Sequence, residues 1–351
     1  RSWPVDLRSR TALVRMIVMS FTPHPSRRSL LAAAGLGAGA ALLAACGSSS
    51  AGGQDGLSVV TSAYPLAYLT TRIGGAHVAL TDLTTPGADA HGLELSVKQV
   101  MTVESADLVL QIPGFQAALD DAIASQGGEN VLDVSSVITL LPIGAADGHG
   151  DHSDESEAEH AEHTEHADDD SDEGHEGHDH GPNDPHFWHD PLLMADLADA
   201  LAARLGELAP QHVEEFTASA QALREELDEL DAELEESFSA VDGRKPFITG
   251  HAAYTYLAQR YDLHQIGISG VDPETEPSPQ RLLALEGLAE EEGVTTVFFE
   301  TSASPKVAQT LARNLGIDSA ELDNLETQQS EEADYAQVMR DNCTALVASW
   351  A

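Results

Sequence analysis

Three histidines stand in similar local settings, although they lie far apart in the chain. His91 follows a predicted strand and a Pro-Gly turn, His186 precedes a predicted helix, and His251 follows a predicted strand and a glycine. Because the carboxyl ends of parallel strands face one edge of a sheet, these junctions can bring three imidazoles together. Each histidine alone could be a capping or surface residue, but the repeated setting favours a shared role. Three imidazoles, with a carboxylate or water as fourth ligand, would make a good Zn²⁺ site.

A second group of histidines lies in a segment of low complexity, residues 147–181. From Asp147 to His180 it holds eight histidines and fifteen acidic residues, with no Lys, no Arg and no large apolar residue. Such a composition cannot build a core, so we expect disorder in the absence of metal. We interpret the segment as an auxiliary loop that captures Zn²⁺ weakly; the alternative is a solvated acidic spacer. Its histidines are His149, His152, His160, His163, His166, His175, His178 and His180.

The overall charge excludes one class of partner. The 351 residues include 17 Lys and Arg against 59 Asp and Glu. Binding of DNA or RNA requires a basic face, so we expect no nucleic-acid partner. A surface of this sign should instead attract cations.

The first 45 residues are typical of an export signal. Arg27 and Arg28 precede an apolar run that is too short and too rich in Gly and Ala to predict a spanning helix, and the run ends at Cys46. Small residues before a cysteine resemble a bacterial lipoprotein processing site, so we expect Cys46 to be lipidated; an ordinary cleaved signal is the alternative. The twin arginines weakly resemble a twin-arginine signal, and Met19 is a candidate start. Residues 46–56 are predicted to form a flexible tether.

The rest of the chain alternates between short apolar runs and helical patterns. Alternation of this kind predicts an α/β fold with two lobes, each with a central, mostly parallel sheet flanked by helices. We assign residues 57–190 to the first lobe, including the 147–181 loop, and residues 242–351 to the second. Residues 191–241 are predicted to be helical and to include one long, rigid helix that joins the lobes. Ligands would bind in the cleft between the lobes.

Several motifs in the mature chain resemble those of one known family. They are "VVTSAYPLAYLTTRIGG", "PGADAHGLELS", "DPHFWHDP", "ITGHAAYTYLAQRY" and "EPSPQRLLALEGLAEEEGVTTVFFET". Together they resemble the zinc-binding solute receptors of ABC importers, the cluster A-I or cluster 9 group, in which an acidic His-rich insertion is typical. The resemblance implies a lipoprotein on the outer face of the cytoplasmic membrane that acts as a monomer. Its partners would be an ABC permease and an ATPase, to which it delivers Zn²⁺ for import.

The resemblance also implies a ligand set. The family's metal ligands fall on His91, His186 and His251, and its late acidic ligand falls on Asp323, with water as the alternative. Asp89 and Glu94 are weaker candidates. Manganese receptors of the same fold carry a carboxylate where His251 stands, so the third imidazole favours zinc.

Other histidines and nearby residues are given lesser roles. His189 replaces the family's usual leucine, and we interpret it as a solvated residue at a helix start, with an alternative ligand or a residue on the ion's path as the other readings. His77 and His212 are expected to be plain surface residues, and His264 to pack at a strand start. Glu300 is expected to support lobe structure or hydrogen bonding.

The function predicted from these features is binding rather than catalysis. The sequence contains neither H-E-x-x-H nor the serine elbow G-x-S-x-G, so we expect no enzyme. Alternatives are a zinc-storing or buffering lipoprotein, an adhesin, or a manganese receptor of the same fold.

Overall fold

The computed structural model describes residues 56–145 and 182–351, apart from residues 274, 303 and 331–333. All described residues fall in one compact unit, Gly53–Ala351. The predicted signal, Cys46, nearly all of the tether, and the eight histidines of the low-complexity segment lie outside the described residues. In the part of the chain that is described, no helix is both long enough and apolar enough to cross a membrane.

The first sheet has four parallel strands in the order β2-β1-β3-β4. Its strands and helices alternate along the chain, as the sequence predicted: β1 (Leu57–Thr61), α1 (Tyr64–Gly74), β2 (Val78–Asp82), α2 (Val97–Ser105), β3 (Leu108–Gln111), α3 (Ala117–Gln126) and β4 (Val131–Asp133). The central strands β1 and β3 are apolar runs buried on both faces, which is what a covered parallel sheet requires.

The second sheet repeats this topology, with four parallel strands in the order β6-β5-β7-β8. Its elements are β5 (Pro246–Thr249), α6 (Thr255–Arg260), β6 (His264–Gly267), α7 (Pro279–Glu292), β7 (Thr296–Glu300), α8 (Lys306–Leu315), β8 (Asp318–Leu322) and α9 (Tyr335–Ser349). In each sheet the first strand is flanked by the second and the third. Because all strands of a sheet are parallel, the loops that follow them lie at the same edge of that sheet.

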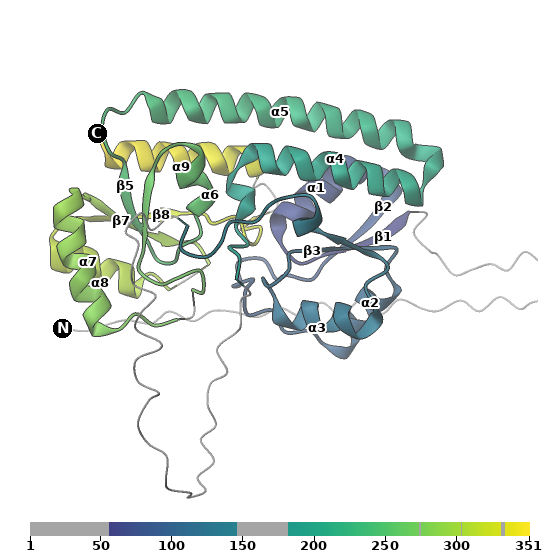
Figure 1. Ribbon diagram of the computed structural model, residues 1–351, viewed down its shortest axis with the longest axis horizontal. Coiled ribbons are helices and arrows are strands. Elements are labelled where there is room, and N and C mark those ends of the chain that lie inside the picture. Colours follow the sequence, from purple (N-terminus) through teal and green to yellow (C-terminus); the bar gives the residue numbers. More distant parts are fainter. Residues whose placement is uncertain (1–55, 146–181, 274, 303, 331–333) are drawn as a thin grey trace, which may run out of the picture. The chain divides into compact units, whose positions relative to one another are not determined.

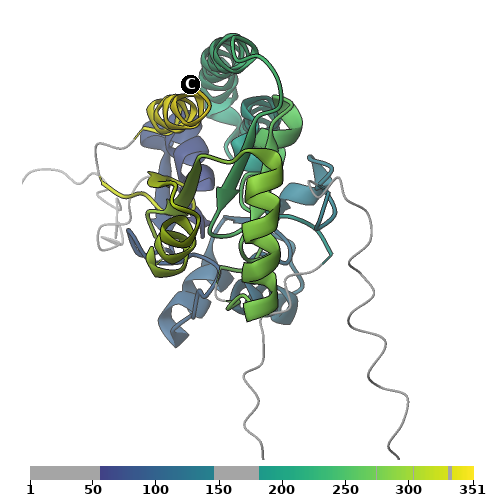
Figure 2. The same ribbon diagram turned by 90° about the vertical axis from the view of Figure 1, so that its left-hand side faces the viewer.

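Two long helices connect the sheets. α4 (Pro191–Leu208) begins behind the cap of Asp190, and α5 (Val213–Ser239) packs along it after a short 3-10 turn, η4 (Pro210–His212). α5 has 27 residues, about 40 Å at 1.5 Å per residue. Ion pairs tie it to both lobes: Arg72 of α1 contacts Glu226, and Arg340 of α9 contacts Glu233. Figures 1 and 2 show α5 and α9 side by side.

The apolar core has three parts. One cluster lies between the first sheet and α2 and α3, and another between the second sheet and α7 and α8. The largest cluster is continuous from the first sheet through α4 and α5 to α9. The predicted fold, two lobes that each have a central parallel sheet flanked by helices, is therefore confirmed.

Candidate metal centre

His91 lies in the loop that follows β2 and is 3% exposed. Its backbone N–H donates to Oδ1 of Asp89 at 2.9 Å. The neighbouring backbone is held by the buried side chain of Gln116, whose Nε2 donates to the carbonyl oxygens of Ala90 at 2.8 Å and Ser62 at 2.7 Å. The ring is thus carried on a loop fixed to the body of the first lobe.

His186 is fully buried at the start of a 3-10 turn, η3 (Phe187–His189). Oδ1 of Asp184 accepts a hydrogen bond from the His186 backbone N–H at 2.9 Å and lies 2.7 Å from Nδ1 of its ring. With its proton on Nδ1, the neutral ring presents the Nε2 lone pair. A carboxylate behind a histidine in this manner orients the ring and raises its basicity as a ligand.

His251 follows β5 and repeats this arrangement with a different acid. Oε1 of Glu300, at the end of β7, accepts from the His251 backbone N–H at 3.0 Å and lies 3.2 Å from Nδ1. The neighbouring Gly250 makes this approach possible, because a Cβ at position 250 would lie 2.2 Å from Oε2 of Glu300. Nε2 of His251 is again the nitrogen that faces inward.

Glu326 lies in the loop after β8, with 1% of its surface exposed. This loop of the second lobe is fastened to other elements: Tyr64, at the start of α1, donates its N–H to the Glu326 carbonyl at 2.9 Å. Nε1 of Trp188 donates to the Asn324 carbonyl at 2.8 Å. Leu325 between them has a φ of 60°, so the chain turns sharply and directs the Glu326 carboxylate inward.

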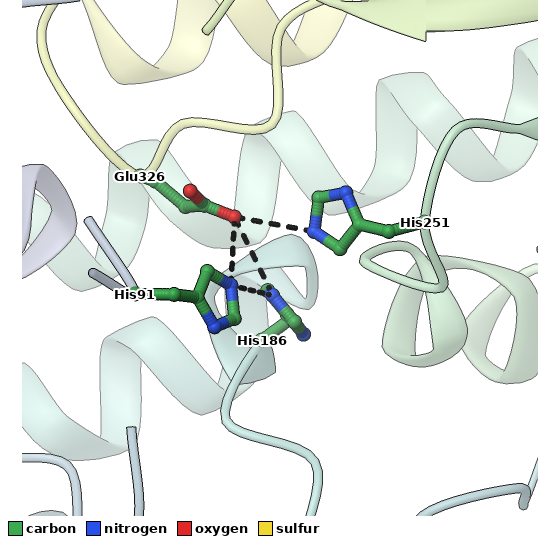
Figure 3. A group of neighbouring side chains, drawn as sticks. All are labelled: His91, His186, His251 and Glu326. Carbon is green, nitrogen blue, oxygen red and sulfur yellow. Dashed lines mark hydrogen bonds and ion pairs between the residues drawn. The ribbon is translucent and has the colours of Figure 1, made fainter. Parts of the chain in front are cut away.

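The four side chains meet around one point, and we call them the central group (Figure 3). Oε1 of Glu326 lies 3.2 Å from Nε2 of His91, 3.5 Å from Nε2 of His186 and 3.3 Å from Nε2 of His251. The Nε2 atoms of His91 and His186 are 3.3 Å apart. Tetrahedral ligands about 2.0–2.1 Å from a zinc ion are separated from one another by about 3.3 Å. These four separations are therefore close to the edge length of a zinc coordination tetrahedron, and all four ligand atoms lie within 4.8 Å of one another.

The charges of the central group are strongly coupled. Burial lowers the pKa of His91 to about 4, although Glu326 opposes this shift. Burial also acts to lower the pKa of His186 and His251, but Asp184 raises the pKa of the first and Glu300 and Glu326 raise that of the second to about 10. Burial alone would raise the pKa of Glu326, yet the three imidazoles hold it well below its usual range. Without metal, the buried Glu326 carboxylate is therefore ionised and faces the protonated imidazole of His251.

Aromatic rings line the central group. Phe115 meets the edge of His91 with ring centroids 4.7 Å apart, and Trp188 lies 5.2 Å from His186. His189 is fully buried and packs on Tyr254 at 4.5 Å, so its interpretation as a solvated residue was wrong. Neither ring nitrogen of His189 has a hydrogen-bond partner among the described residues, and His189 is not part of the central group.

The carboxylate in the central group is not the one expected from the sequence. Oδ1 of Asp323 accepts from the Leu325 backbone N–H at 2.8 Å, which stabilises the loop, and Asp323 lies outside the group. Glu94 is exposed, and Asp89 supports the backbone of His91. Glu326 is three residues beyond Asp323, in the same loop after β8. Its position in that loop is the one feature of the sequence that points to Glu326 as a ligand.

Comparisons with known proteins agree with this geometry. The family model described as "Zinc-uptake complex component A periplasmic" matches residues 59–349. The chain belongs to this zinc-uptake family. It is 32% identical over 322 residues to the high-affinity zinc uptake system protein ZnuA of Bacillus subtilis, covering 87% of this chain and 92% of that protein. It is 32% identical over 295 residues to the zinc-binding protein AdcA of Streptococcus pyogenes, covering 83% of this chain and 55% of AdcA. The chain thus spans about half the length of the AdcA proteins it matches.

The fold of this chain also resembles that of a solved structure. The laminin-binding protein Lmb of Streptococcus agalactiae, described as bifunctional with adhesin and metal-transporting activity, superposes with a TM-score of 0.69 at 29% identity. The match covers 84% of this chain and all of Lmb. The two-sheet architecture is therefore shared with Lmb.

Proposed function

We propose that the chain is an extracytoplasmic zinc receptor that delivers Zn²⁺ to an ABC permease and its ATPase. The observation that carries this proposal is the central group: His91, His186, His251 and Glu326 are buried and set at the spacing of a zinc tetrahedron. Membership of the zinc-uptake family supports zinc as the cargo, as does the set of three imidazoles, which suits zinc better than manganese.

The neighbouring acids favour binding over catalysis. A hydrolytic zinc centre needs a free carboxylate beside a metal-bound water. Asp184 supports the ring of His186, Glu300 supports His251, and Asp89 accepts a hydrogen bond from the backbone of His91. Glu326 itself lies among the rings. Since each already has a partner, the group is built to hold an ion rather than to activate water.

The remaining parts of the proposal come from the sequence. A lipid on Cys46 would anchor the receptor, as a monomer, to the outer face of the cytoplasmic membrane. The histidines of residues 147–181 would collect Zn²⁺ at low affinity. The backbone around this segment is paired, since the N–H of Asp184 donates to the Leu141 carbonyl at 2.8 Å and that of Ile143 to the Pro182 carbonyl at 3.1 Å. Captured zinc would then be released close to His186.

The rigid connection limits the motion used in transfer. α5 is one helix tied to α1 and α9 by ion pairs, and the Glu326 loop is hydrogen-bonded to Trp188 and Tyr64. We therefore propose that zinc release involves small rocking and loop movements rather than wide opening of the lobes.

Zinc titration against a calibrated chelator tests the proposal. The full chain should hold one zinc ion that resists the chelator, and His91→Ala, His186→Ala and His251→Ala should each remove it. His264→Ala, a control at a half-buried histidine of β6 outside the group, should retain it. A protein from which residues 147–181 are deleted should keep the tight ion. Loss of that ion on deletion, with retention in the three alanine variants, would overturn the assignment.

A further inference from the structure

His77 and His212, expected to be plain surface residues, lie face to face. Their ring centroids are 3.7 Å apart and their planes are inclined by 21°. His77 ends the 3-10 turn η1 (Gly75–His77) directly before β2, and His212 ends η4 directly before α5. They are 135 positions apart in the chain and meet because α1 packs against α5.

Glu215, in the first turn of α5, contacts both rings. Its Oε2 lies 2.8 Å from Nε2 of His77, and its Oε1 lies 3.3 Å from Nδ1 of His212. The hydrogen bond with His77 is the main cause of a lowered pKa for Glu215. The carboxylate is therefore ionised at neutral pH and faces two nitrogens at once. We call these three residues the peripheral group.

A buried aromatic side chain supports the two imidazole rings. Phe216 is fully buried and meets both rings edge-on, with centroids 5.9 Å from His77 and 6.2 Å from His212. The N–H of His212 donates to the Ala209 carbonyl at 2.9 Å, which fixes the turn that carries the ring. The two imidazoles therefore pack on a buried side chain instead of projecting freely into solvent.

The spacing and exposure of the peripheral group suit a metal ion. One ligand atom from each residue lies within 4.8 Å of the others. The histidine side chains are 29% and 30% exposed and that of Glu215 is 63% exposed, so an ion and its waters can reach them. Two imidazoles and one carboxylate, with water in the fourth position, are an established ligand set for Zn²⁺. A carboxylate bridging two imidazoles without metal is the other explanation, and the experiment below separates the two.

We propose that His77, His212 and Glu215 form a second zinc site, which binds one ion more weakly than the central group does. Its lower affinity follows from three protein ligands instead of four and from greater exposure to water. The site lies at the other edge of the first sheet, because His77 precedes β2 whereas His91 follows it. Bound zinc would clamp η1 to the start of α5 without reaching the central group.

Histidine NMR of the full chain in zinc-buffered solution tests this site directly. A chelator buffer fixes the concentration of free zinc, so zinc bound by other histidines does not change that concentration. After the central group fills, the ring signals of His77 and His212 should shift together with a single midpoint. Glu215→Gln should move that midpoint to at least about tenfold higher free zinc, because the charged ligand is lost. Crystals soaked in zinc should show anomalous density among the three residues.

A neighbouring residue supplies the matched control. Glu214 is an exposed carboxylate in the same turn of α5, outside the peripheral group. Glu214→Gln removes the same charge and should leave the midpoint unchanged. Ring signals that fail to shift, that shift with separate midpoints, or that respond equally to the two substitutions would overturn the second site. The tight ion of the central group is measured separately, so either proposal can fail alone.

Discussion

Glu300 holds His251 by both its backbone and its ring. One oxygen, Oε1, accepts from the backbone N–H at 3.0 Å and lies 3.2 Å from Nδ1 of the imidazole. β7 and the end of β5 are neighbours in the second sheet, so the position of this ring is set by the register of two strands. Glu300 never has to touch the ion to influence how well His251 binds it.

Replacing Glu300 by glutamine should therefore weaken zinc binding without abolishing it. An amide keeps the shape but loses the charge that favours the Nδ1 proton, and loss of such supporting carboxylates typically reduces metal affinity about 10–100-fold. Chelator competition gives the affinity, and Glu321→Gln, an exposed acid on β8, is the control. An unchanged affinity for Glu300→Gln would show that the contact has no role in ligation.

Two acids of the loop after β8, Glu326 and Asp323, are candidates for the fourth ligand, and substitutions distinguish them. Glu326→Gln should lower zinc affinity by at least about 100-fold, because a charged ligand is replaced by a poor neutral one in a buried site. Asp323→Asn should change it less than about threefold, since the amide oxygen can still accept the Leu325 hydrogen bond. Both are measured by the same competition. The reverse order would restore Asp323 as the ligand expected from the sequence.

The fold was predictable because its elements are strongly patterned. Apolar runs such as that of β3 alternate with helical segments, and α5 shows its leucine face plainly. The exact ends of the elements depend on tertiary contacts: α6 begins at Thr255, and before it the N–H of Ala252 pairs with the Gly270 carbonyl in place of a helical turn.

The sites were less predictable, because tertiary contacts decide them. The setting of each histidine before or after an element was enough to bring His91, His186 and His251 into one prediction. Glu326 lies in an irregular loop whose path depends on hydrogen bonds with Tyr64 and Trp188, which no periodicity reveals. The contact between His77 and His212 likewise depends on the packing of α1 against α5. Sequence patterns predict which element carries a side chain, whereas tertiary packing decides which residues that side chain contacts.

Zinc binding should release protons at alkaline pH. The acids around His251 raise its pKa to about 10, so in the metal-free protein this ring is still protonated at about pH 8. An imidazole that ligates zinc through Nε2 must lose the proton on that nitrogen. At least one proton per tight zinc should therefore leave at about pH 8.

Calorimetry in buffers of different ionisation enthalpy counts these protons. Since binding releases protons, affinity must rise with pH, by about tenfold per pH unit for each proton released. Acidification should weaken binding further as the pH falls toward about 4, where His91 also becomes protonated. Glu300→Gln should reduce the release at about pH 8, because it removes the main cause of the raised pKa of His251. A release of zero in the unmodified protein would contradict the charge state inferred for the group.

His189→Leu should stabilise the metal-free protein. His189 is fully buried against Tyr254, and neither ring nitrogen finds a partner in the described part of the chain. An unsatisfied buried polar group costs about 1–3 kcal/mol, and leucine fills a similar space without that cost, so a gain of about 1 kcal/mol is expected. Urea unfolding measures it, and His189→Asn, which keeps a buried polar group, should show no such gain.

The pH dependence of that gain provides an independent check. Burial lowers the pKa of His189 from 6.5 to about 3. Between these values the unfolded chain binds the proton and the folded chain does not, so this residue favours unfolding as the pH falls from 6.5 toward 3. Leucine removes the effect, and the stability advantage of His189→Leu should therefore widen on acidification. An advantage that stays constant over this range would mean that the pKa of His189 is not lowered in the folded protein.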